Sequence, residues 1–120
     1  MPKDFVKDRV ILNLGAVDQV CVVYINKKSV MKHEGGYLPF SVDITDYLKP
    51  DKTNEIAIYV KDDLNIKYPY GKQTKKPEGM WYTKVSGIWQ SVWLESVPNE
   101  YIKAFNFTYN EPDLELNIEL

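Results

Sequence analysis

Apolar and polar residues alternate along most of the chain, in short runs rich in Val, Ile, Phe and Tyr. This two-residue period is typical of strands that bury one face. Gly, Pro, Asn and Asp separate the runs and mark turns. Since no stretch repeats apolar residues at helical spacing over three turns, the pattern predicts an all-β fold, an antiparallel β-sandwich or jelly roll. The predicted strands are residues 9–17, 19–26, 37–44, 54–62, 87–97, 101–109 and 114–120.

Two predicted strands show which of their residues should face the core. The alternation selects Leu38, Phe40, Val42 and Ile44 in the first strand, and Ile56, Ile58 and Val60 in the second. Between these strands, residues 43–50 form the one predicted helical turn. Asp43 or Thr45 could cap this turn, and Pro50 would stop it.

All three tryptophans lie between residues 81 and 93. Trp89 and Trp93 are four residues apart in a predicted strand, so they should share a face, and their size favours core packing. Trp81 falls in residues 63–86, the longest segment without a strand pattern. Irregular loops of this length are uncommon unless they are functional. Because aromatic rings stack on the C–H face of sugars, Trp81 is either a sugar contact or a packing residue.

Composition and charge limit the binding partners and the cellular compartment that the sequence predicts. Fifteen basic and seventeen acidic residues give a net charge of −2, so neither nucleic acid nor an anionic membrane is a predicted partner. No apolar run approaches the roughly 18 residues that cross a bilayer, and the charged start does not resemble a signal peptide. The sequence therefore predicts a cytoplasmic domain whose single cysteine, Cys21, is a buried free thiol.

The residues that could perform chemistry are few. One His and one Cys form no zinc-ligand set, so neither a metal nor another cofactor is predicted. His33 is expected in a solvated turn beside Glu34. Glycoside hydrolysis needs two carboxylates about 5–9 Å apart. Asp62 and Asp63 are adjacent and would point to opposite faces of an extended chain, so no catalytic residue is predicted.

An ordered set of motifs resembles one family. The stretch "LNLGAVDQVCVVYINKKSVMKHEGGYLPFSVDITDYLK" is followed by "NEIAIYVKDD", "YGKQ" and "WYTKVSGIWQSVWLE". In this order they resemble the sugar-binding domain of glycoside hydrolase family 2, of the β-galactosidase-like kind, over about residues 10–99. The resemblance implies a galactose-binding-domain-like jelly roll at residues 1–98. Residues 99–120 resemble the first strands of the immunoglobulin-like domain that follows in such enzymes.

The resemblance also implies a function. Members of the family are retaining glycosidases, including β-galactosidases, β-glucuronidases and β-mannosidases, whose two catalytic glutamates lie on a later TIM-barrel domain. The chain would then be a non-catalytic sugar-binding domain that borders the substrate pocket. Its implied partners are carbohydrate and the immunoglobulin-like and barrel domains of the same protein. Two alternatives stay open, a stand-alone carbohydrate-binding module and a structural domain for interdomain or oligomer contacts.

Carried over by position, the segment before "SGIW" faces the pocket. Trp81 stands where some members have an acidic residue that touches the sugar. The family normally has a further strand before the strand of residues 9–17, whereas only eight residues precede that strand here. Open strand edges would favour pairing with a second copy. The predicted substrate-binding residues are Asp62, Tyr70, Lys72, Gln73, Trp81 and Tyr82.

Overall fold

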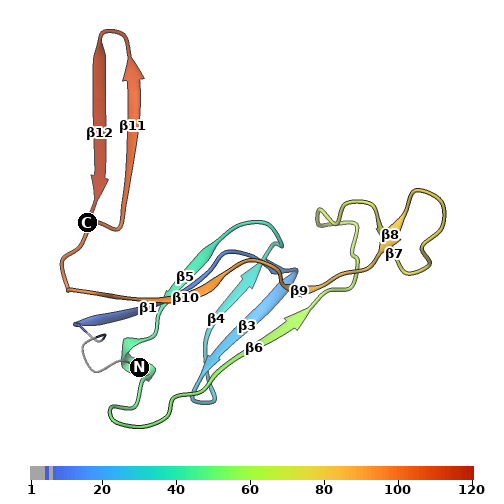
Figure 1. Ribbon diagram of the computed structural model, residues 1–120, viewed down its shortest axis with the longest axis horizontal. Helices are drawn as coiled ribbons and strands as arrows, with labels where there is room; N and C mark the ends of the chain where they lie inside the picture. Colours follow the sequence, from blue (N-terminus) through green and yellow to red (C-terminus); the bar gives the residue numbers. More distant parts are fainter. Residues whose placement is uncertain (1–4, 6) are drawn as a thin grey trace.

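The computed structural model describes residue 5 and residues 7–120, apart from the side chain of residue 110. Two three-stranded antiparallel sheets form the body of the molecule (Figure 1). In spatial order, the first sheet is β10 (Val92–Val97), β1 (Arg9–Leu14) and β5 (Phe40–Asp43), and the second is β4 (Lys28–Glu34), β3 (Val20–Ile25) and β6 (Ile56–Lys61). The prediction of an all-β antiparallel fold is confirmed.

Three short ladders complete the fold. A seam pairs β2 (Val17–Asp18) with β9 (Gly87–Ile88), and the long loop holds the one parallel pair among the described strands, β7 (Gln73–Thr74) with β8 (Tyr82–Thr83). The hairpin of β11 (Ala104–Asn110) and β12 (Asp113–Glu119) stands apart from both sheets (Figure 1).

The core lies between β1 and β3. Alternate residues of each strand are fully buried, as the two-residue period requires. Each buried Val, Leu or Ile contributes about 1.5–3 kcal/mol to folding. Cys21 is buried in this cluster and is a free thiol, as predicted. The buried cluster contains Val10, Leu12, Leu14, Val17, Cys21, Val23, Ile25, Phe40 and Ile44.

Two turns follow local sequence chemistry. Asn26 and Lys27 join β3 to β4 with φ values of 50° and 71°, the left-handed conformation of a tight hairpin turn. The predicted helical turn is a single 3₁₀ turn, η1 (Thr45–Tyr47). Oδ1 of Asp43 accepts a hydrogen bond from the Thr45 backbone N–H at 2.9 Å, which fixes the start of this turn.

Several expectations are wrong in detail. The sequence pattern missed β4, which carries few apolar residues and forms because it pairs with β3. His33 lies in that strand, stacked on Phe40 with ring centroids 4.0 Å apart, rather than in a solvated turn. Leu38 is exposed because β5 begins only at Phe40.

Trp89 and Trp93 are not core residues. Their exposed fractions are 53% and 42%, and the predicted strand 87–97 is interrupted between β9 and β10. Leu12 of β1 lies opposite Leu94, so it is Leu94 that packs against the core and Trp93 that faces outward. Nε1 of Trp93 donates to Oε1 of Glu95 at 2.9 Å on that outer face.

Over the part of the chain that is described, no helix has the length and apolar character to cross a membrane.

The buried cluster generates a first prediction. Leu12→Ala should lower the free energy of unfolding by about 2–5 kcal/mol, because it removes a fully buried side chain between two sheets. Leu38→Ala is the matched control: Leu38 is 69% exposed, and its removal should cost less than about 0.5 kcal/mol. Urea denaturation followed by circular dichroism measures both changes. Equal losses in the two variants would contradict this location of the core.

Candidate functional site

The chain crosses from β1 to β3 through residues 15–19, at the end of the body where the two sheets meet the long loop (Figure 1). So short a crossing brings polar side chains into the interior, where Asp18 is 8% and Gln19 is 2% exposed. Two hydrogen bonds, one from its backbone and one from its side chain, hold Gln19 in place. Its carbonyl oxygen accepts from the Gly35 N–H at 2.9 Å, and its Nε2 donates to the Pro69 carbonyl at 3.4 Å.

The carboxylate of Asp18 lies against the backbone of Gly36. A Cβ atom at Gly36 would fall 2.5 Å from Oδ1 of Asp18, so only glycine allows this approach. Oδ1 is buried and has no hydrogen-bond partner. Burial raises the pKa of the Asp18 carboxyl above its usual value, the negative charge of Asp62 raises it further, and the positive charge of Lys84 opposes both.

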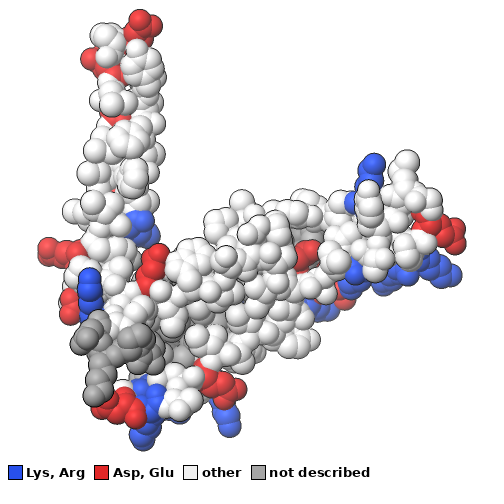
Figure 2. All heavy atoms as spheres, in the orientation of Figure 1, with Lys and Arg blue, Asp and Glu red and all other residues white. Residues whose placement is uncertain are grey.

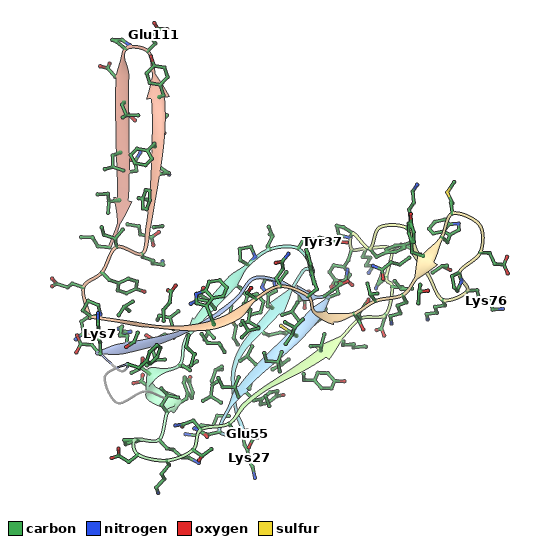
Figure 3. All side chains as sticks on the ribbon, in the orientation of Figure 1. Lys7, Lys27, Tyr37, Glu55, Lys76 and Glu111 are labelled. Carbon is green, nitrogen blue, oxygen red and sulfur yellow. The ribbon has the colours of Figure 1, made fainter. Side chains whose placement is uncertain are left out.

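Asp18 lines a hollow of about 210 Å³ between the β2–β9 seam and the long loop. Aromatic side chains form one wall: the rings of Trp89 and Tyr37 meet edge to face with centroids 6.0 Å apart. Nε1 of Trp89 donates to the Gly36 carbonyl at 2.7 Å and fixes the indole. Figure 3 labels Tyr37 on the β4–β5 connection, beside this end of the sheets. The hollow is lined by Asp18, Tyr37, Gln73, Val85, Ser86, Gly87 and Trp89.

The long loop supplies the opposite wall. Oε1 of Gln73 accepts a hydrogen bond from the Val85 N–H at 2.7 Å, which closes the loop on itself beside the hollow. Tyr68 fastens the loop to the body because its hydroxyl donates to Oε2 of Glu34 at 3.1 Å. Lys76, at the far end of the loop, lies away from the sheets (Figure 3).

Two of the predicted substrate-binding residues lie at or next to the hollow. Gln73 lines it. Asp62 is half-buried behind Asp18: its Oδ1 accepts from the Leu64 N–H at 3.0 Å, and its Oδ2 is buried without a partner. Nζ of Lys84 donates to the Asp62 carbonyl oxygen. The adjacent Asp63 points elsewhere and pairs with Lys61, as expected for neighbours in an extended chain.

The other predicted residues form a separate group in the loop and do not line the hollow. The Tyr82 N–H donates to the Lys72 carbonyl at 2.8 Å, and the Trp81 N–H donates to the Glu78 carbonyl at 3.1 Å. The side chains of Trp81 and Tyr82 are 47% and 68% exposed, and Tyr70 is half-buried. A sugar-binding role for Tyr70, Lys72, Trp81 and Tyr82 stays a prediction.

Sequence reasoning missed Asp18, Tyr37 and Trp89. The signals were weak but present: Asp18 is an acidic residue set between two apolar runs, and Tyr37 follows the glycine pair of "EGGY". The size of Trp89 and its place in an alternating strand predict a core residue, but that strand is interrupted between β9 and β10. Among the described residues, no group of three or more His, Cys, Asp or Glu is placed to hold a metal ion.

Comparison with known proteins agrees with this architecture. The chain is 33% identical over 106 residues to a β-galactosidase of Thermoanaerobacter pseudethanolicus, covering 86% of this chain and 13% of that protein. It is 35% identical over 85 residues to a β-glucuronidase of Paenibacillus borealis, covering 66% of this chain and 14% of that protein. The chain therefore spans about one seventh of the length of these relatives.

Solved structures show the same relationship. A crystal structure of Bacteroides uniformis β-glucuronidase superposes with a TM-score of 0.63 at 31% identity, covering 82% of this chain and 11% of that one. Residues 1–98 match the family described as "Glycosyl hydrolases family 2, sugar binding domain". The chain belongs to glycosyl hydrolase family 2, through its sugar-binding domain.

Proposed function

We propose that the chain is the non-catalytic sugar-binding β-sandwich of a longer retaining glycosidase, and that the hollow at the β2–β9 seam holds part of the substrate. The observation that carries the proposal is Asp18, a largely buried carboxylate that lines the hollow together with Trp89 and Tyr37. Carboxylates accept hydrogen bonds from sugar hydroxyls, and rings such as that of Trp89 stack on the apolar face of a sugar.

The family assignment supports the same proposal. In this proposal a barrel domain of the longer protein supplies both catalytic glutamates, and the long loop of this chain borders its pocket. The two relatives named above are a β-galactosidase and a β-glucuronidase, so the glycoside is either a neutral galactoside or an anionic glucuronide. A stand-alone carbohydrate-binding module would use the same hollow without a barrel.

The hairpin of β11 and β12 is the basis of a second part of the proposal. The two strands pair residue by residue, and large apolar side chains from both lie on one face. All are more than half exposed, and Figure 2 shows that the visible surface of the hairpin is largely uncharged away from its tip. We infer that residues 99–120 begin the following immunoglobulin-like domain, whose further strands cover this face. The face consists of Phe105, Phe107, Tyr109, Leu114, Leu116 and Ile118.

The sugar proposal can be tested one tryptophan at a time. The three indole N–H groups give separate signals in a ¹⁵N–¹H correlation spectrum, assigned by single Trp→Phe variants. Titration with methyl β-D-galactoside should move the Trp89 signal and leave that of Trp93, which bonds Glu95 on the outer face, unchanged. Movement of the Trp81 signal as well would bring the long loop into the site. If no indole responds up to about 100 mM sugar, which corresponds to less than about 1.4 kcal/mol of binding, the proposal fails.

A second test concerns the stability cost of Asp18. Because the folded state raises its pKa, the ionised carboxylate destabilises the fold above that pKa, and the effect vanishes below the unfolded pKa where both states are protonated. Asp18→Asn should therefore raise Tm by roughly 2–5 °C at about pH 7, and the gain should disappear toward about pH 4.

The matched control is Asp46→Asn, which neutralises an exposed residue of η1 and should leave Tm unchanged within about 1 °C. Thermal melts followed by circular dichroism at both pH values measure the differences. A lower Tm for Asp18→Asn at neutral pH would mean that the carboxylate stabilises the fold and is not held there at a cost.

The hairpin assignment predicts its hydrogen-exchange behaviour. Two strands without a covering layer are marginally stable, so the β11 and β12 amides should exchange at least about 100-fold faster than those of β1 and β3. In a chain extended through the next domain, the same amides should become protected. Amides of β11 as slow as those of β1 in the 120-residue chain would show that the apolar face is already covered, for example by a second copy.

A further inference from the structure

The hollow contains one charge. Asp18 is the only lining residue whose side chain is normally charged at neutral pH; the others are aromatic, apolar or neutral polar side chains and one glycine. Asp18 is 8% exposed, and no hydrogen-bond donor contacts its Oδ1. The negative charge on that oxygen is therefore not offset by a hydrogen bond. A ligand in this hollow therefore meets a negative group of low hydration.

The nearby charges do not reverse this field. Asp62 adds a second negative charge behind Asp18. Lys84 is the cation whose charge acts on Asp18, but its ammonium donates to the Asp62 carbonyl oxygen and does not line the hollow. Two carboxylates and one ammonium give the site a net negative charge. Because Asp18 is buried, dissolved salt screens its charge less than it would screen an exposed charge.

On the basis of the proposed sugar function, we propose that the hollow selects neutral hexosides and rejects hexuronates. A neutral sugar presents hydroxyl donors, and one of them can approach the Asp18 carboxylate through Oδ2, because Oδ1 is buried against Gly36. A hexuronate brings a carboxylate into a site that already holds one and offers no lining cation to receive it. Of the two sugar classes left open above, the charge of this chain favours the neutral one.

The geometry of the walls is compatible with this selection. Trp89 and Tyr37 offer ring surface to the C–H face that neutral hexosides and hexuronates share, so the aromatic wall does not distinguish them. Ser86 and Gln73 add neutral polar atoms on the loop side. Discrimination between neutral hexosides and hexuronates therefore depends on the Asp18 carboxylate. Changing Asp18 alone tests it.

The experiment compares methyl β-D-galactoside with methyl β-D-glucuronide on the 120-residue chain at neutral pH, following the Trp89 indole signal. The neutral sugar should bind at least about tenfold more tightly, because like charges in a poorly solvated site repel strongly. In Asp18→Asn the ratio should fall to about threefold or less through a gain in glucuronide affinity. Asp46→Asn, far from the hollow, should keep the wild-type ratio.

A second variant guards against misfolding of Asp18→Asn. Ser86→Lys places an ammonium on an exposed residue of the loop wall and should raise glucuronide affinity relative to galactoside, with Asp18 intact.

The outcomes separate the two proposals. Equal binding of both sugars, tighter binding of the glucuronide, or a ratio that Asp18→Asn does not change would overturn the selectivity and leave the sugar function standing. Absence of any response to either sugar would overturn the sugar function itself, and the selectivity with it.

Discussion

The packing of β1 against β3 determines most of this molecule. Their buried faces meet between the two sheets, and only residues 15–19 connect them. The connection is too short to pass over the surface, so Asp18 and Gln19 lie in the interior, where a longer loop would have left them in solvent. The hollow lies beside this crossing: Asp18 of the connection lines it, together with Gln73 and residues 85–86 of the long loop.

Most of the fold can be predicted from the sequence, because the alternation of apolar and polar residues indicates which face of each strand is buried. The errors arose where the alternation allows either face of a strand to be the buried one. For β10, either Val92 and Leu94 or Trp93 and Glu95 could face the core. The size of tryptophan favoured the second choice, but Glu95 shares the face of Trp93, and an unpaired carboxylate cannot enter an apolar core. The charge of Glu95 therefore indicates the exposed face of β10 more reliably than the size of Trp93 indicates the buried face.

The site was much less accessible to sequence reasoning. Asp18, Tyr37, Gln73 and Trp89 come from four separate segments, and only the folded chain brings them to one hollow. The length and the aromatic residues of the long loop predict a binding role for it, and Gln73, one of the residues predicted there, lines the hollow. The binding role itself stays a prediction. Trp81 drew attention because it is aromatic and lies in that loop, yet proximity to the hollow depends on how the loop folds back, which the Tyr68–Glu34 and Gln73–Val85 hydrogen bonds decide.

The contact between Gly36 and Asp18 links two positions that are far apart along the chain. A Cβ atom at position 36 would lie 2.5 Å from Oδ1 and 3.0 Å from Cγ of Asp18, so a larger residue there requires the Asp18 carboxylate to move or a shorter side chain at position 18. The order of substitutions open to this domain during evolution is therefore constrained. A shorter side chain at position 18 would first make room for a side chain at position 36, whereas the reverse order passes through a chain in which residues 18 and 36 clash.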